Sequence, residues 1–379
     1  MRSNSHTNSD RRRLSGKVAI VGADESDEIG IVPSKSSLQL HAEAARNALA
    51  DAGIDMSDVD GLFTAGPGWS HSLQVAEYLG IQPRYTDSTS VGGSSFVIHV
   101  EHAAAAIQAG LINVALITHG QSGHSDRRRP GTGRPSLDPW FPAPQFESPY
   151  HVGGPPSVYA MACMRHMHQY GTTHEQLAEI AVATRKWAML NPKAMMRDPL
   201  TIDDVLSSRW ITYPFHLLDC CLVTDAGGAV VVTSAERAKD CPKKPVLVLG
   251  SGEATTHQTI ASMPDLTTTP AAISGPLAFE MAGVRHKAID VTVLDLRPVS
   301  DAIDFFVIAS GSSDIHVRAL AEYVPADARL IARKPASLTF VSPIGKCCKL
   351  LTALRCFNPS SPIPQRYKLS HWSLRSPRR

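Results

Sequence analysis

A short run of small residues, Ser90-Val91-Gly92-Gly93-Ser94, stands directly before a helical pattern at Ser94–Gly110. The N-terminus of a helix carries unpaired backbone N–H groups and the positive end of the helix dipole, so it can bind an oxyanion or activate a nucleophile. A serine hydroxyl has a much higher pKa than a thiol, and Ser90 would need an adjacent base to act as a nucleophile. Three interpretations of Ser90 stay open: a turn or N-cap residue, a nucleophile, or a group that binds a carbonyl together with the glycine amides.

The cysteines and histidines form no pattern typical of metal or redox sites. None of the seven Cys belongs to a CxxC pair, so we expect free thiols in a reducing cytoplasm. No clustered His/Cys signature predicts a metal, and no GxGxxG follows a strand, which argues against NAD and flavin cofactors. The second half offers four histidines, none of them in a Gly-His-Pro turn: His257, His286, His316 and His371.

Alternating strand and helix patterns surround the Ser90 turn. Short apolar runs predict strands at Lys17–Gly22, Val59–Thr64 and Ile112–His119. Helical spacing and caps predict helices at Ser36–Gly53 and Ser94–Gly110. This alternation predicts an α/β fold with a mainly parallel sheet and helices on both faces.

Residues 121–210 interrupt this alternation and are predicted to form an insertion carried on the sheet. Its first part is rich in Pro and Gly, and helical patterns follow at Val158–Tyr170, Thr173–Asn191 and Ile202–Ser208. Thr173 and Gln176 are spaced as a capping box. A strand pattern returns at Ala229–Val232.

A second strand–helix series begins with PVLVLG at 245–250, which resembles KVAIVG at 17–22. The similarity predicts two halves of related topology. This second series includes a helix at Ile273–Ala282, strands at Val291–Leu294 and Asp304–Ser310, and a helix at Ile315–Tyr323.

The composition describes a globular protein with an unusual C-terminal segment. The chain is 43% hydrophobic and 19% charged, so it can bury a core. No run of 18 apolar residues predicts a membrane span, and the polar start lacks a signal-peptide pattern. Residues 329–379 hold eleven Lys or Arg and no Asp or Glu, although the whole chain has a net charge of only +2. Such a tail is typical of a solvated segment, and binding to an anionic surface or an aberrant terminus are the alternatives.

Four blocks together resemble the thiolase superfamily, in particular thiolase-like proteins related to the sterol-carrier-protein thiolases. They are AEAARNALADAGIDMSDVDG, VGGSSFVIHVEHAAAAIQAGLINVALITHG, residues 173–209, and LLDCCLVTDAGGAVVV, within about residues 17–290. The resemblance implies a layered αβαβα fold of two halves, with a helical loop domain at 121–210 in the first half (17–240), and the start of a second half at 241–290. It also implies a cytoplasmic homodimer that acts on acyl-CoA in lipid metabolism. A dimer interface would bury the strand Ile112–His119 or its neighbour.

The resemblance also assigns site residues. It places Ser90 where the family has its nucleophilic Cys, and Gly92, Gly93 and Ser94 where the acyl group binds. It places coenzyme A, as acyl carrier, on the insertion, where the cations that could hold its phosphates are Arg127, Arg128, Arg185, Lys186 and Arg197. The family's C-terminal catalytic His and Cys segments have no counterpart here. The resemblance implies one of two functions. The chain is either a thiolase-like acyltransferase of the acetyl-CoA acetyltransferase type, with impaired condensing activity, or an acyl-CoA-binding protein.

A second resemblance begins near residue 286. The segment HKAIDVTVLDLRPVSDAIDFFVIASGSSDIHVRALAEYV at 286–324 resembles the ribosomal silencing factor (Iojap-like) family. It implies contact with the large ribosomal subunit, so a ribosome-associated binding protein and a non-functional gene fusion are the alternative functions. The C-terminal half of the thiolase-like fold is then truncated or replaced. On this division, 1–16 is a disordered arm and 325–379 a basic, disordered tail.

Overall fold

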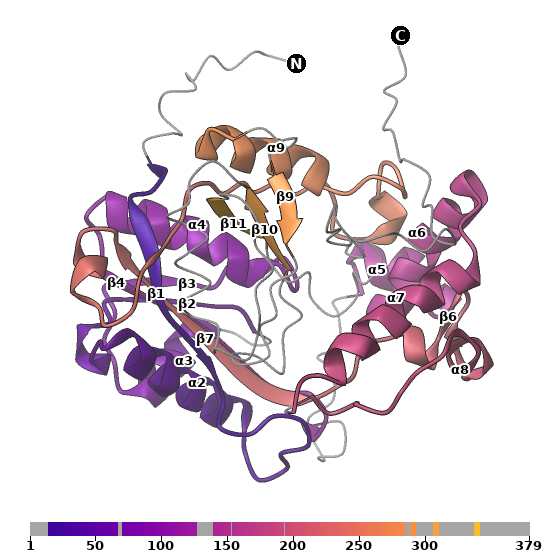
Figure 1. Ribbon diagram of the computed structural model, residues 1–379, viewed down its shortest axis with the longest axis horizontal. Helices are drawn as coiled ribbons and strands as arrows, with labels where there is room; N and C mark the ends of the chain where they lie inside the picture. The colour runs from indigo at the N-terminus through magenta and orange to yellow at the C-terminus, as the bar shows by residue number, and fades with distance from the viewer. Residues whose placement is uncertain are drawn as a thin grey trace, which may run out of the picture.

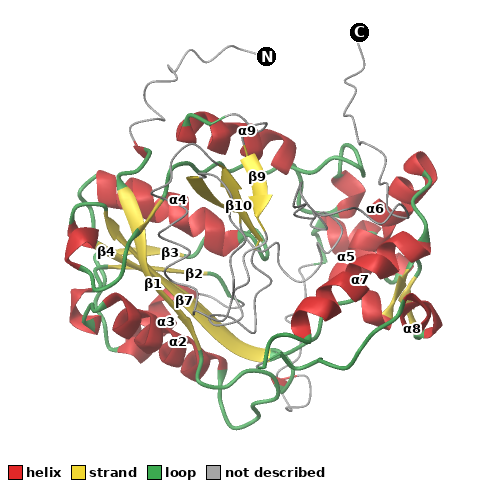
Figure 2. Ribbon diagram, viewed as in Figure 1, coloured by secondary structure: helices red, strands yellow, loops and turns green. Residues whose placement is uncertain are grey.

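The computed structural model describes residues 14–66, 70–126, 139–152, 154–192 and 194–284, and the strands at 289–292, 306–310 and 337–341. Arg127, Arg128 and the helix expected at 315–323 lie outside the described residues. Figures 1 and 2 show a sheet covered by helices on one side of the molecule and a group of helices on the other.

A six-stranded sheet with the order β3-β2-β4-β7-β1-β8 is the centre of the described fold. Its strands are β1 (Val18–Glu25), β2 (Gly61–Thr64), β3 (Tyr85–Asp87), β4 (Val114–Ser122), β7 (Asp225–Ser234) and β8 (Val246–Leu247). β2 is parallel to β3 and β4, whereas β7 is antiparallel to β4 and β1. β8 is also antiparallel to β1. The sheet is therefore mixed, and the expected mainly parallel sheet is wrong for β7 and β8. The insertion leaves β4 and enters β7 at the same end of these two neighbouring strands, so β7 runs antiparallel to β4.

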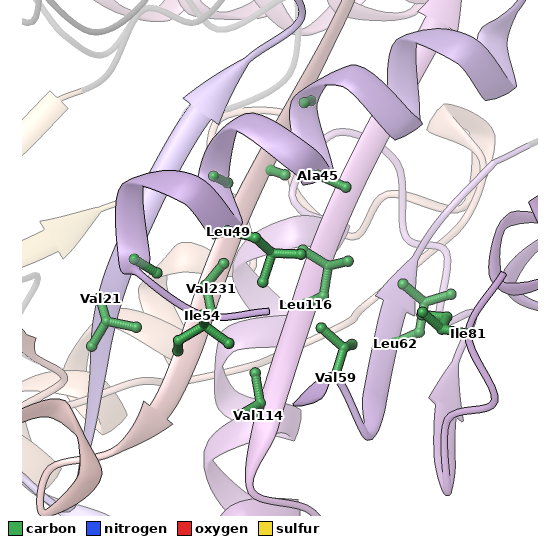
Figure 3. Close-up of a cluster of buried hydrophobic side chains, with 14 of the residues drawn as sticks. Val21, Ala45, Leu49, Ile54, Val59, Leu62, Ile81, Val114, Leu116 and Val231 are labelled. Carbon is green, nitrogen blue, oxygen red and sulfur yellow. The ribbon is translucent and has the colours of Figure 1, made fainter. Parts of the chain in front are cut away.

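Helices cover both faces of this sheet, as the sequence predicted. α2 (Ser37–Ala52) and α3 (His71–Leu79) bury one face in a cluster that includes Leu49, Leu62 and Leu116 (Figure 3). α4 (Ser95–Gln108) covers the other face through Ala103, Ala104 and Ile107. Leu62 and Leu116 belong to the first cluster, whereas the next residues along the same strands, Phe63 and Ile117, belong to the second. Successive side chains of a strand point to opposite faces of the sheet, so both faces are buried.

The local signals placed α2 and α4 to within two residues. Ser36 caps α2 through a capping box with Gln39, and Gly53 ends it in a left-handed conformation at φ 65°. The sequence did not indicate α3 or β3. β3 is three residues long, and its pairing with β2 rather than its own apolar pattern makes it a strand.

The two halves repeat one strand–helix contact. A Cβ on Gly22 of β1 would lie 2.3 Å from the carbonyl oxygen of Ala48 in α2. A Cβ on Gly250, after β8, would lie 2.2 Å from the carbonyl oxygen of Ala278 in α9 (Ala271–Ala282). Only glycine permits such close backbone approach. The repeated contact supports the related topology that KVAIVG and PVLVLG predicted.

The insertion between β4 and β7 contains helices and a small hairpin. They are α5 (Pro142–Phe146), α6 (Pro155–Tyr170), α7 (His174–Ala188), α8 (Ile202–Ser207), β5 (Trp210–Thr212) and β6 (Phe215–His216). The predicted capping box of Thr173 and Gln176 begins α7. The insertion reaches past residue 210, because the hairpin and the chain up to β7 also belong to it.

β9 (Ile289–Thr292), β10 (Phe306–Ser310) and β11 (Ser337–Val341) pair antiparallel in a separate sheet. β11 lies in the segment expected to be disordered, whose other residues lie outside the described part of the chain.

β4 and its neighbours β2 and β7 each have strands on both sides, and the edges of this sheet are β3 and β8. The expected burial of 112–119 in a dimer interface stays a prediction. Within the described residues, no helix combines the length and the apolar character that crossing a bilayer requires.

Candidate functional site

The turn Ser90–Ser94 joins β3 to α4 and leads into the helix, as predicted. All five residues of the turn are exposed. Ser94 is the N-cap residue of α4, but its side chain makes no capping hydrogen bond. The positive φ of the turn, 87°, belongs to Gly92 rather than Gly93, so Gly92 is the residue whose missing side chain the backbone requires.

Ser95, which the sequence analysis missed, holds this turn. Its buried hydroxyl accepts a hydrogen bond from the Val91 N–H at 2.9 Å and donates one to the Gly92 carbonyl at 2.6 Å. Two consecutive serines at the start of the helix were the only signal for it. Among the described residues, the N–H groups of Gly92, Gly93 and Ser94 find no acceptor. These three amides are available to an oxyanion at the positive end of α4.

Ser90 has no base beside it in the described part of the chain. Its hydroxyl makes no hydrogen bond there, and the nearest imidazole in sequence, His99, is bonded through Nε2 to the Thr89 carbonyl at 3.0 Å. A serine without a bonded base keeps its proton at neutral pH. The geometry therefore argues against the nucleophile interpretation, and the turn serine and the carbonyl-binding group stay open.

Histidines buried behind the turn were also missed. His99 packs between Phe63 and Phe96, with ring centroids 6.1 and 5.9 Å away. His41 lies further in, 1% exposed, and its ring is 5.4 Å from that of His71. Burial, with a smaller contribution from neighbouring imidazoles, lowers the pKa of His41 to about 3, so this imidazole is neutral. The spacing of His99 and His102 in IHVEH at 98–102 could have indicated two histidines on one helix face.

A groove of about 640 Å³ lies between β3 and α4. Asp87, Ser88 and Thr89, which precede Ser90, form one wall, and His102 of α4 forms another. The groove continues along α4 toward Leu111, and its lining does not include the residues of the Ser90–Ser94 turn.

Three of the five predicted cations lie on or after α7. Arg185 is half-buried and donates from Nη1 to the Asp198 carbonyl at 2.8 Å. Lys186 and Arg197 are exposed and form no ion pair within the described ranges. No hydrogen bond among the described residues joins these cations to the Ser90 turn. Phosphate binding by them stays a prediction, as it does for Arg127 and Arg128.

Among the cysteines that the structure describes, Cys163 is buried, whereas Cys220, Cys221 and Cys241 are half-buried. Burial, and to a smaller extent Asp219, raises the pKa of the Cys163 thiol to about 11, so it carries no thiolate at neutral pH. In the described part of the chain, no group of His, Cys, Asp and Glu has the arrangement of a metal site.

Two bacterial relatives are similar to this chain over the thiolase-like region. It is 37% identical over 246 residues to the steroid side-chain-cleaving aldolase of Thermomonospora curvata, an alignment that covers 63% of this chain and 62% of the relative. It is 37% identical over 241 residues to the 17-hydroxy-3-oxo-4-pregnene-20-carboxyl-CoA lyase of Mycobacterium tuberculosis, which covers 62% of each. The chain therefore spans less than two thirds of the length of these relatives.

Solved structures extend the comparison. The structure of an Ltp2-ChsH2(DUF35) aldolase matches with a TM-score of 0.65 and 34% identity, over 73% of this chain and 72% of that one. A monomeric SCP2-thiolase-like protein type 1 from Mycobacterium smegmatis matches in fold, with a TM-score of 0.57 and 21% identity, over 73% of this chain and 59% of that one.

The chain belongs to the thiolase superfamily. Its layered α/β fold and the expected resemblance to sterol-carrier-protein-type thiolases are confirmed. The second resemblance is also confirmed, since residues 277–338 match the family described as "Ribosomal silencing factor during starvation". The start of that match overlaps the end of α9, whose contact with Gly250 belongs to the thiolase-like body.

Proposed function

We propose that this thiolase-like chain binds an acyl-CoA thioester without forming an acyl-enzyme, and that the Ser90–Ser94 turn binds the thioester carbonyl. The observation that supports this is the turn itself: three amides at the N-terminus of α4 that find no acceptor among the described residues, beside a serine hydroxyl that no described base contacts. Ser90 contributes a hydrogen bond to the carbonyl rather than a covalent bond. Condensation of the thiolase kind, which uses an acylated nucleophile, is impaired by this arrangement.

The cleavage of a carbon–carbon bond suits such a site, and two relatives are named an aldolase and a lyase. In a retro-aldol reaction of a β-hydroxyacyl-CoA, a base removes the hydroxyl proton and the bond between the α and β carbons breaks. The bonding pair forms a thioester enolate, and the α carbon then takes a proton. Negative charge develops on the thioester oxygen, where the turn amides and the dipole of α4 stabilise it.

Coenzyme A is the acyl carrier in this proposal. Its phosphates would be held by the cations of the insertion: Arg127, Arg128, Arg185, Lys186 and Arg197. A cytoplasmic location and a homodimer accompany the proposal as predictions. Acetyl transfer is the alternative activity, and it would require Ser90 to become acylated.

The test compares the wild-type chain with Ser90→Ala and Gly92→Ala. The substrate is a 17-hydroxysteroid whose side chain is an acyl-CoA thioester, so that the 17-hydroxyl is the β-hydroxyl group. The ketone and the shortened acyl-CoA are measured by liquid chromatography and mass spectrometry, and binding of the substrate by calorimetry. We expect Ser90→Ala to keep activity within about fivefold, since it removes one hydrogen bond. Gly92→Ala should lose at least about tenfold, because a Cβ at φ 87° strains the turn.

Intact mass after incubation with acetyl-CoA separates the two chemistries. The proposal expects no adduct in the wild type. A mass increase of one acetyl group that disappears in Ser90→Ala would establish covalent acyl transfer and contradict the non-covalent role of the turn. Absence of both binding and cleavage would reduce the conclusion to the fold.

A second candidate function is contact with the ribosome through the segment 286–324, which the family match over residues 277–338 supports. Co-sedimentation of the full chain with large ribosomal subunits at low salt tests it. Failure to sediment, with an intact silencing factor sedimenting in parallel, would exclude this function.

A further inference from the structure

Thr89, the residue before Ser90, is held from both sides. Its N–H donates to Asp87 Oδ1 at 2.7 Å, and its carbonyl accepts from His99 Nε2 at 3.0 Å. The position of the Ser90 turn therefore depends on one carboxylate at the end of β3 and one imidazole on α4.

Asp87 is in turn held by a second histidine. Its other oxygen, Oδ2, lies 2.5 Å from His102 Nδ1, and His102 Nε2 lies 3.1 Å from Oε2 of Glu253, in the segment after β8. Both ring nitrogens thus face carboxylates, which only accept hydrogen bonds. Only the protonated imidazolium can donate to both at once.

We propose that His102 is a positioning residue for the Ser90 turn. Its imidazolium joins Asp87 to Glu253, and deprotonation of His102 breaks this link. The consequence for acyl-CoA binding rests on the proposed function, whereas the positioning itself does not. The network spans three elements that meet only in the folded chain: the end of β3, the middle of α4 and the start of the second half.

The charges around His102 favour its protonated form. Burial alone would lower the pKa of His102, but its hydrogen bonds and charge interactions with Asp87 and Glu253 outweigh burial and raise it. His99, whose ring centroid is 6.4 Å away on the same helix, has a pKa lowered by burial and adds no positive charge near neutral pH. Asp87, although burial opposes its charged form, has a lowered pKa because Thr89 and His102 donate to it.

Loss of the His102 proton removes one of its two donors. The hydrogen bond to Asp87 is the shorter, and Asp87 is 10% exposed against 31% for Glu253. The remaining N–H therefore stays on Asp87, while a lone pair on Nε2 faces the Glu253 carboxylate. Glu253 is released first. Asp87 then accepts the Thr89 N–H from a less firmly held position, because the imidazole that anchors Asp87 is no longer a charged donor.

The experiment is rapid-quench hydrogen–deuterium exchange of the full-length protein between pH 5.5 and 8.5, corrected for intrinsic exchange rates. It follows peptides covering 88–94, and imidazole NMR assigns the titration of His102. We expect protection of these peptides to fall about tenfold as the pH rises through the pKa of His102. His102→Asn keeps a donor near the Nδ1 position but cannot titrate, so its protection should lack the step.

His168→Asn is the matched control, because His168 is exposed on α6 and should leave the step unchanged. A wild-type profile without a step, or a step that persists in His102→Asn, overturns the proposal. His102→Ala should lose protection at every pH. If His102→Ala unfolds, the folded His102→Asn variant still provides the test.

Calorimetry with the acyl-CoA at pH 6 and pH 8.5 separates the two proposals. A step in exchange without any acyl-CoA binding supports the positioning role and contradicts the proposed function. Binding that weakens with the same midpoint in the wild type, but not in His102→Asn, supports both.

Discussion

Asp225, at the start of β7, is a single residue that joins three segments of the chain. It is fully buried, and its carboxylate accepts hydrogen bonds from the N–H groups of Val32, His124 and Ser125 and from the Ser125 hydroxyl, at 2.6–3.0 Å. Burial opposes its charge, but these hydrogen bonds outweigh it and lower its pKa. Its contribution to stability is therefore present above its unfolded pKa of 3.8 and is lost as the pH falls through the folded value.

Asp225→Asn should lower the free energy of unfolding by about 3 kcal/mol, because the amide turns a donor toward backbone donors and removes the buried charge that they stabilise. Urea denaturation at pH 7 measures the change. The exposed Asp55→Asn is the control and should leave the midpoint where it is. Equal midpoints for the two variants would show that the four hydrogen bonds contribute no net stability.

At the scale of elements, glycines decide how closely the helices approach the strands. Gly250 has the Ala278 carbonyl in the place of a side chain, whereas Gly275, inside α9, has nothing within 4 Å of a Cβ. The same helix therefore contains its own control. One glycine is required by packing, and the other only weakens the helix.

We expect Gly250→Ala to destabilise the protein by about 2–3 kcal/mol through overpacking, and Gly275→Ala to stabilise it by about 0.5–1 kcal/mol through helix propensity. Thermal and urea unfolding of both variants measure the two effects. If the two substitutions shifted stability in the same direction, the close contact between α9 and Gly250 would be refuted.

At the scale of the whole molecule, buried histidines make stability depend on pH. The pKa of His41 is about 3, and burial also lowers the pKa of His71 and His99. Below the ordinary histidine pKa of 6.5, the unfolded chain binds more protons than the folded one, so stability is lost as the pH falls. His102 acts in the opposite sense, since its raised pKa stabilises the fold at low pH and that contribution disappears as the pH rises.

His41 alone should make the protein about 2 kcal/mol less stable at pH 5 than at pH 8, since one unit of pKa difference corresponds to about 1.4 kcal/mol. His41→Asn retains a partner for the Thr118 hydroxyl, which His41 Nδ1 meets at 2.9 Å, but cannot be protonated. Urea midpoints between pH 5 and 8 should therefore vary less in this variant. The same pH slope in both proteins would mean that His41 is not the group that titrates.

The sequence predicted what depends on local chemistry. The serine cap at residue 36, the capping box of Thr173 and the glycine at residue 53 mark helix ends within a few residues, because each makes its hydrogen bonds to its own turn. The Ser90 turn before α4 was predicted for the same reason. Its assignment to a site came from the family resemblance, because a serine beside glycines is common in turns.

The tertiary structure decided what depends on residues far apart in the chain. The direction of β7, the strand state of β3 and the meeting of Asp87, His102 and Glu253 each require segments that the fold alone brings together, with His102 and Glu253 151 residues apart. Local sequence patterns depend on the backbone conformation of neighbouring residues in the chain. Hydrogen bonds across a sheet and between buried charged groups depend instead on which residues are neighbours in space. The sequence thus determined where the helix of the site begins, and only the fold determined which groups hold it.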